Sequence, residues 1–155
     1  MACYIFGAGS FYGLDRCPRA DDFIIAADGG LKHTRKLGIE PNETIGDFDS
    51  LGFTPPGAEI FPVEKDDTDM MAAIRLGRER GFRSFCLYGG TGGRVDHTLA
   101  NLQSLLYLRR RGARGYMYDD DFLWTVMENE SLTIQRTVEW GLFSAFSLGD
   151  RAEGI

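Results

Sequence analysis

Two aspartates separated by one residue form the part of this sequence best suited to bind a metal ion. Asp47 and Asp49 lie in the sequence G-D-F-D-S at residues 46–50, directly after the short run 43–45. Side chains alternate along an extended backbone, so the two carboxylates are expected to point to the same side. Oxygen ligands of this kind suit Mg²⁺, which completes its coordination shell with waters and substrate phosphates. The alternative is a turn at a strand end, in which Asp and Ser side chains bond the local backbone.

Acidic residues also adjoin other predicted elements. Asp28 comes directly after the apolar run 23–27, and a polar cluster precedes the predicted helix 70–81. This cluster consists of Lys65, Asp66, Asp67, Thr68 and Asp69. Asp and Thr are common helix N-caps, and that role explains Asp28 or one or two members of the cluster. It does not require three aspartates beside a lysine, so the cluster favours a functional site.

A glycine-rich loop followed by a basic residue offers the complementary chemistry for an anion. Four of the five residues 89–93 are glycines, whose backbone N–H groups have room to approach a phosphate. Arg94 supplies the cation that a phosphate would bind. Asp96 is a candidate helix cap, and His97 and Asn101 lie one helical turn apart near the loop. For His97 we expect a structural rather than a catalytic role.

Apolar runs and helical periodicity predict strands that alternate with helices. The predicted strands are 3–6, 23–27, 84–88 and 115–118, and the predicted helices are 31–37 and 70–81. A further helix is predicted to face the core with Val95, Leu99, Leu102 and Leu106. This alternation predicts an α/β fold with a doubly wound, mainly parallel, Rossmann-like sheet. Ligands bind such sheets at the carboxyl ends of the strands, where the acids and the glycine loops converge.

An acidic crevice with glycine loops, Lys65 and Arg94 is chemically a site for a Mg²⁺–nucleotide complex. The metal bridges phosphate oxygens, and the basic side chains stabilise the charge that spreads during phosphoryl transfer. The sequence contains neither a Walker A motif nor the G-x-S-x-G motif of a serine nucleophile. We therefore expect a reaction that depends on positioning and electrostatics.

The sequence pattern changes near residue 120. We expect residues 1–120 to form an α/β catalytic domain that binds Mg²⁺ and a nucleotide, and residues 121–155 to begin a C-terminal β domain. Apolar residues alternate with polar ones there, namely Leu132, Ile134, Leu142, Phe146 and Leu148. About three strands are too few for an independent sheet sandwich. The antiparallel β-sandwich is therefore expected to be incomplete, because the sequence is shortened or because a partner chain completes it.

Composition restricts the partners and the compartment. The formal net charge of −6 argues against nucleic-acid binding, which needs clustered Lys and Arg. The first residues lack the features of a signal peptide, and no apolar stretch is long enough to span a membrane. The three cysteines have no metal-binding spacing and suit a reducing compartment. We expect a soluble cytoplasmic protein with neither a nucleic-acid nor a membrane partner.

Four motifs occur in a single order along the chain. They are A-A-D-G-G at 26–30, G-D-F-D-S at 46–50, D-x-T-D at 66–69 and G-G-x-x-G-R-x-D-H at 89–97. With these motifs the chain resembles the thiamine pyrophosphokinase (thiamine diphosphokinase) family. The resemblance implies transfer of a pyrophosphoryl group from ATP to thiamine, which gives thiamine diphosphate and AMP. It also implies a homodimer in which each thiamine pocket lies at the contact between subunits.

The resemblance assigns roles to the residues at the matching positions. The residues that would hold Mg²⁺ are Asp28, Asp47, Asp49 and Asp69, and the catalytic set would be Asp47, Asp49, Asp69 and Asp96. Those that would bind ATP are Lys65, Asp66, Thr68, Gly89, Gly90, Arg94 and Asn101. Asp96 would support Arg94 or the metal. Thiamine-binding residues are expected mainly in the C-terminal β domain and at the dimer contact, and family members continue well beyond the equivalent of Ile155.

Two other functions fit the same residues. The first is a pyrophosphokinase that uses another heterocyclic alcohol, such as a hydroxymethylpterin, as the acceptor. The second is a nucleotide- or thiamine-binding protein without catalytic activity. The nucleotide product and the identity of the acceptor would separate these functions from thiamine pyrophosphorylation.

Overall fold

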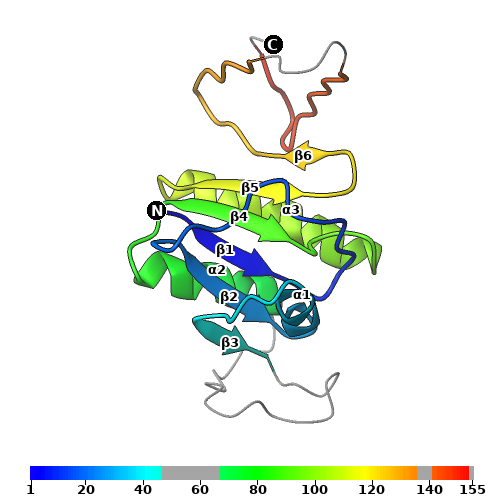
Figure 1. The fold of residues 1–155 in the computed structure, drawn as a ribbon. Coiled ribbons are helices and arrows are strands. Elements are labelled where there is room, and N and C mark those ends of the chain that lie inside the picture. Colours follow the sequence, from blue (N-terminus) through cyan, green and yellow to red (C-terminus); the bar gives the residue numbers. More distant parts are fainter. Residues whose placement is uncertain (47–66, 136–140, 154–155) are drawn as a thin grey trace.

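The computed structural model describes residues 1–46, 67–135 and 141–153 (Figure 1). The candidate residues Asp47, Asp49, Lys65 and Asp66 lie outside the described residues. The strands are β1 (Cys3–Phe6), β2 (Phe23–Ala27), β3 (Glu43–Ile45), β4 (Ser84–Tyr88), β5 (Arg114–Tyr118) and β6 (Leu123–Trp124). The helices are α1 (Gly30–Lys36), α2 (Asp69–Glu79) and α3 (Val95–Arg110). The strands and helices predicted above are therefore present, with small shifts of their ends, whereas a further short strand expected at 59–63 lies outside the described residues.

The strands form one sheet in the order β3-β2-β1-β4-β5-β6. Neighbouring strands from β3 to β5 are parallel, whereas β6 pairs antiparallel with β5. In the centre, Ile5 of β1 lies beside Ile25 of β2 and Leu87 of β4. The chain runs outward from β1 to β3 and then returns to continue from β4 on the other side. The strand order therefore reverses between β1 and β4, where sheets of this kind open a ligand crevice.

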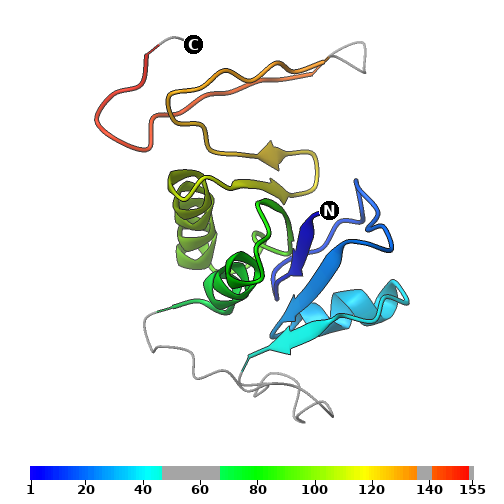
Figure 2. The same ribbon diagram turned by 90° about the vertical axis from the view of Figure 1, so that its left-hand side faces the viewer.

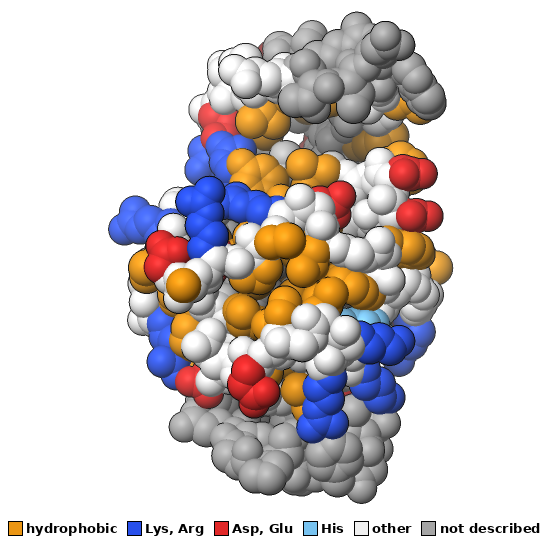
Figure 3. Space-filling model, in the orientation of Figure 1, with side chains coloured by type: hydrophobic (Ala, Val, Ile, Leu, Met, Phe, Trp, Pro, Cys, Tyr) orange, Lys and Arg blue, Asp and Glu red, His pale blue; other side chains and the backbone are white. Residues whose placement is uncertain are grey.

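Helices cover both faces of the sheet, as predicted for a doubly wound fold. In Figure 2, α2 and α3 lie on one side of the sheet and α1 on the other. The larger core lies under α2 and α3 and includes Ile5, Ile25, Ile74, Phe85, Leu87, Leu105, Leu108 and Met117. The opposite face buries Tyr4, Phe6, Cys86 and Tyr88. Figure 3 shows apolar side chains gathered at the centre of that face, with basic side chains around them.

Helix α3 faces the core with a side that matches the predicted one only in part, since Leu102 packs against the core as expected. The predicted core side consisted of Val95, Leu99, Leu102 and Leu106, but Val95 and Leu99 are 74% and 58% exposed. Leu105 and Leu108 are buried instead, and a Cβ at Gly115 of β5 would lie 2.7 Å and 2.8 Å from their side chains. Because Gly115 has no side chain, Leu105 and Leu108 of the helix can pack directly against β5 at this position. The helix has apolar residues on more than one side, so periodicity alone could not select the buried one.

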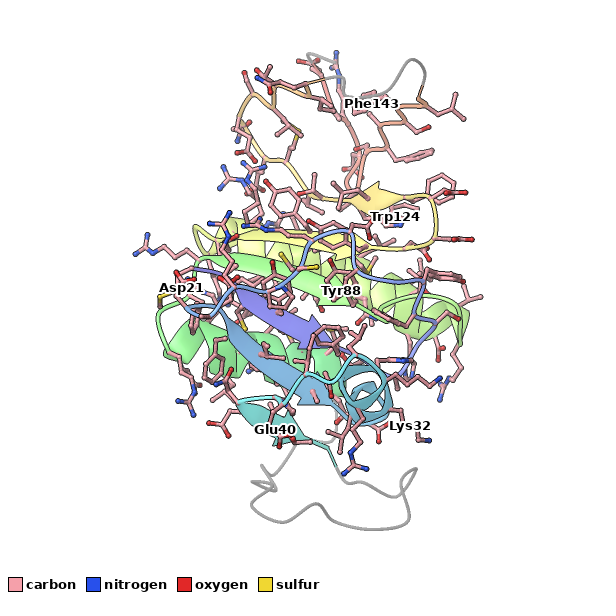
Figure 4. All side chains as sticks on the ribbon, in the orientation of Figure 1. Asp21, Lys32, Glu40, Tyr88, Trp124 and Phe143 are labelled. Atoms are coloured by element: carbon pink, nitrogen blue, oxygen red, sulfur yellow. The ribbon has the colours of Figure 1, made fainter. Side chains whose placement is uncertain are left out.

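The chain after β5 continues the sheet only briefly. β6 has two residues, and no further strand occurs in residues 125–135 and 141–153. Figure 4 places Phe143 beyond Trp124 of β6 and away from Tyr88 in the sheet. Leu142 and Phe146 are 93% and 78% exposed. The C-terminal β-sandwich and the domain division near residue 120 stay predictions. No helix in the described part of the chain is long and apolar enough to cross a membrane.

The loops that follow β1 and β4 pack backbone against backbone. The N–H of Gly7 donates to the carbonyl of Tyr88 at 2.8 Å, and the N–H of Gly9 donates to the carbonyl of Gly89 at 2.9 Å. Gly89 has a φ of +65°, and a Cβ there would lie 2.4 Å from the carbonyl oxygen of Gly7. A side chain at Gly89 would therefore meet both a strained backbone conformation and a rigid neighbour.

We predict that Gly89→Ala destabilises the fold by at least about 2 kcal/mol, because it combines left-handed strain with a backbone clash. Urea unfolding followed by circular dichroism measures the change. Gly93→Ala is the matched control, since a Cβ there meets nothing within 4 Å. This control should stay within about 0.5 kcal/mol of the wild type. Equal stability of the two variants would show that the β1–β4 contact does not constrain residue 89.

Candidate active-site cleft

A cleft of about 380 Å³ opens at the carboxyl ends of β1, β2 and β4. Its walls come from the segments 7–9, 27–28, 67–70, 89–94 and 97–101. The predicted site residues among them are Asp28, Thr68, Asp69, Gly89, Gly90, Arg94 and Asn101. The cleft therefore lies where the strand order reverses, between β1 and β4, with the starts of α2 and α3 on its rim.

Asp28 projects from the end of β2 in an unusual backbone conformation. Its φ of 47° is rare and costly for a residue with a side chain. The backbone N–H of Asp28 donates to the carbonyl of Ile45 at 2.7 Å, which extends the pairing of β2 and β3. A Cβ at Gly46, with its φ of 143°, would lie 3.1 Å from the Cα of Asp28. Gly46, which precedes Asp47 in the sequence, thus packs directly against Asp28.

The alternative role of Asp28 as a helix cap is wrong. The N-cap of α1 is Gly29, and it makes no side-chain capping bond. Asp28 lies one residue earlier, where the positive φ turns the chain between the strand and the helix. Strain of this kind is retained where the surroundings fix it, often at functional sites.

The start of α2 supplies the second group of polar side chains. Thr68 is its N-cap, and its Oγ1 accepts the N–H of Met71 at 3.2 Å. This bond occupies the oxygen as an acceptor, so the hydroxyl hydrogen points elsewhere and can be donated to a ligand. Asp69 is the first residue of the helix and lines the cleft. Asp67 also lines it and forms an ion pair with Arg75, whose Nη2 lies 2.9 Å from Oδ2.

The glycine loop after β4 forms the opposite wall. Asn101, buried in the second turn of α3, donates from Nδ2 to the carbonyl oxygen of Gly90 at 2.7 Å. The N–H of Ser10 reaches the carbonyl of Thr91 at 2.8 Å, so the loops after β1 and β4 hold each other in place. This wall carries no acidic side chain. The cleft is therefore acidic towards β2 and α2, and neutral to basic towards β4 and α3.

Arg94 and Asp96 form an ion pair at the mouth of the cleft. The Nε of Arg94 lies 3.1 Å from Oδ1 of Asp96, and a second bond joins Nη2 to Oδ2. The Arg94 hydrogen bonds lower the pKa of Asp96, and those bonds in turn raise the pKa of Arg94. Arg94 lines the cleft, whereas Asp96 contacts it through Arg94. The N-cap of α3 is Arg94, so the alternative role of Asp96 as the cap is wrong.

Several residues at the site have no role that the sequence motifs predict. His33 of α1 contacts Gly9 from the other side of the sheet, because its Nε2 lies 2.9 Å from the Gly9 carbonyl oxygen. Burial lowers the pKa of His33. Thr91 and Thr98 also line the cleft, as does His97, for which only a structural role was expected. No sequence pattern indicates His33, because only the fold brings α1 to the loop after β1.

The donor set fits a hard divalent cation. Asp28 and Asp69 line one cleft, and carboxylate oxygens are the ligands that Mg²⁺ prefers. Within residues 1–46, 67–135 and 141–153, no three His, Cys, Asp or Glu side chains form a complete metal-binding group. The other two predicted ligands, Asp47 and Asp49, lie outside those ranges. Asp28 and Asp69 would hold Mg²⁺ from the acidic wall.

Comparisons with known proteins identify a family that the sequence matches. Residues 14–117 match the thiamin pyrophosphokinase catalytic domain. Thiamine pyrophosphokinase of Bacillus subtilis (strain 168) is 36% identical over 91 residues, which cover 54% of this chain and 42% of that protein.

Solved structures agree as well. The thiamine pyrophosphokinase structure from Bacillus subtilis has a TM-score of 0.66 at 28% identity, over 77% of this chain and 61% of its own. The structure from Geobacillus thermodenitrificans has a TM-score of 0.64 at 30% identity, over 74% and 59%. This chain thus spans about two fifths of the curated relative and three fifths of the solved ones. The matched domain, residues 14–117, extends over more than half of the chain. The chain therefore belongs to the thiamin pyrophosphokinase catalytic-domain family.

Proposed function

We propose that this protein transfers the pyrophosphoryl group of ATP to thiamine, giving thiamine diphosphate and AMP. The observation that carries the proposal is the division of the cleft. Carboxylates of Asp28 and Asp69 form one wall, and the glycine loop with Arg94 forms the other. This division suits a metal–phosphate complex, because the carboxylates attract the metal cation and Arg94 attracts the phosphate anions. The relatives named above are thiamine pyrophosphokinases, which supports thiamine as the acceptor.

The side chains have separate tasks in this reaction. Asp28 and Asp69, with Asp47 and Asp49 from the preceding motif, would hold Mg²⁺, which neutralises charge on the phosphates when it is bound. Thr68 donates its hydroxyl hydrogen to a phosphate oxygen, and Arg94 binds another. We propose that Lys65, Asp66, Gly89 and Gly90 also bind ATP, as the sequence motifs indicate.

The chemical step is an in-line displacement. The hydroxyl oxygen of thiamine forms a bond to the β-phosphorus of ATP, and the bond from that phosphorus to the oxygen shared with the α-phosphate breaks. AMP leaves with the electron pair of the broken bond, and the hydroxyl proton is lost to a base. Asp96 orients the guanidinium of Arg94 through two hydrogen bonds, so its contribution to catalysis is made through Arg94.

The remaining proposals concern assembly and location. We propose a homodimer whose subunit contact and C-terminal β domain bind thiamine, since Leu142 and Phe146 present apolar surface in the segment after β6. Residues 1–120 would act as the ATP- and Mg²⁺-binding domain. A cytoplasmic location fits the free thiols of Cys3, Cys17 and Cys86.

Product analysis tests the reaction directly. With Mg²⁺, ATP and thiamine, we expect AMP and thiamine diphosphate in equal amounts, and no product after the metal is removed by chelation. Chromatography of the nucleotides and of the acceptor measures both. ADP as the product would exclude pyrophosphoryl transfer. If AMP forms only when a hydroxymethylpterin is supplied, the acceptor is that alcohol and not thiamine. If ATP binds but no AMP forms, the protein is catalytically silent.

Asp69→Asn tests the acidic wall. We expect kcat to fall at least about 100-fold, because the substitution removes a charged ligand from the metal–phosphate complex. The free energy of unfolding should change by less than about 2 kcal/mol, because Asn has the shape of Asp and keeps an oxygen acceptor at the helix start. Glu79→Gln, at the exposed end of the same helix, is the control and should keep full activity. If Asp69→Asn unfolds the protein while activity per folded molecule is normal, Asp69 is structural.

A further inference from the structure

Two polar atoms in the cleft wall have no hydrogen-bond partner within the described part of the chain. They are Oγ1 of Thr91 and Oδ1 of Asn101, and each residue is only 6% exposed. Both residues line the cleft. The other buried side-chain atoms without a partner are Arg78 Nε, Arg114 Nη1 and Trp124 Nε1, and those residues do not line it. Native proteins leave few buried polar atoms unpaired, so the two in the cleft require an explanation.

The orientation of the Asn101 amide is fixed by its neighbour. The carbonyl oxygen of Gly90 lies 2.7 Å from one amide atom of Asn101, and a carbonyl can only accept a hydrogen bond. The atom that faces it must therefore be the NH₂ group. Oδ1 is left as the unpaired atom, and an amide oxygen can only accept. A reversed amide would bring two oxygens together at Gly90.

This chemistry excludes phosphate as the partner of Oδ1 of Asn101, although the second N–H of the amide is still a donor. Phosphate oxygens at neutral pH are acceptors, so they would repel Oδ1. The partner must present an O–H or N–H donor. Thr91 offers a hydroxyl that both donates and accepts, which suits a neighbouring hydroxyl or amino group. The resemblance assigned Asn101 to ATP as a whole, and its unpaired Oδ1 can bond only a part of a ligand that carries a hydrogen-bond donor.

We infer that Asn101 and Thr91 form a neutral recognition site for a hydroxyl or amino donor of a bound substrate. The acidic wall then binds the metal–phosphate complex, while this end of the cleft selects the uncharged part of the ligand. Two substrates carry such donors: the nucleoside of ATP, and the acceptor alcohol. The inference rests on the proposed function and deepens it, because it assigns specificity-determining residues to the same cleft.

Thr91→Val tests the inference with little change in shape. The substitution replaces an unpaired buried hydroxyl by a methyl group, so the melting temperature of the ligand-free protein should stay the same or rise. Affinity for one substrate should fall roughly 3- to 10-fold, the loss expected for one neutral hydrogen bond. Calorimetry measures the Kd of Mg²⁺ with α,β-methylene-ATP, whose α–β bridge resists cleavage, and separately the Kd of thiamine.

Analogues that lack one donor identify the partner. The set is the 2′-deoxy, 3′-deoxy and 6-deamino forms of α,β-methylene-ATP, together with thiamine lacking its hydroxyl. The wild type should lose affinity for one of them, and Thr91→Val should bind that analogue and its parent equally well. Loss with a nucleotide analogue assigns the site to the nucleoside, and loss with deoxythiamine assigns it to the acceptor.

Ser104→Ala is the matched control on α3. Its hydroxyl is buried but already donates to the carbonyl of Ala100 at 3.0 Å, and Ser104 does not line the cleft. This variant should keep wild-type affinity for both substrates. The inference is overturned if Thr91→Val binds both substrates with a Kd within twofold of the wild type. It is also overturned if the loss of affinity in Thr91→Val, relative to the wild type, is the same for every analogue. A wild-type protein that binds neither substrate would instead refute the proposed function itself.

Discussion

The contact between the loops after β1 and β4 is the constraint on which the cleft depends. Gly7 and Gly89 meet with no room for a side chain, and the N–H of Gly9 bonds the carbonyl of Gly89. This contact holds two loops at the point where the strand order reverses. Each wall of the cleft is then placed by a strand of the central sheet, so that the acids on one side and the glycine loop on the other keep a fixed separation.

The sequence predicted the strands and helices well because each depends mainly on residues close to it in the chain. Continuous apolar runs gave β1, β2 and β4, since parallel strands are covered on both faces. Thr68 was correctly identified as a possible cap, because capping depends on the first turn of the helix alone. The convergence of Asp28, Asp69 and Arg94 on one cleft also followed from strand ends that meet at one edge of the sheet.

The errors arose where distant segments decide the outcome. The buried side of α3 depends on Gly115 of β5, which lets Leu105 and Leu108 approach the sheet. Periodicity within the helix contains no information about that strand. Asp28 was weighed as a helix cap, but its position is set by the pairing of its N–H with Ile45 across the sheet. The amide oxygen of Asn101 is identified as unpaired only from the structure, because the NH₂ group of the same side chain bonds the carbonyl of Gly90.

The bond between His33 and Gly9 connects the cleft to the opposite side of the sheet. His33 stacks on Phe11 with ring centroids 5.2 Å apart, and Phe11 in turn contacts the ring of Tyr88 at 6.1 Å. These rings pack on the α1 side, while the carbonyl that His33 holds belongs to a cleft-lining loop. The rings of His33, Phe11 and Tyr88 are thus connected, through His33 and Gly9, to a loop that lines the cleft. A change in the packing of these rings is therefore expected to shift the loop after β1, although none of the three side chains lines the cleft.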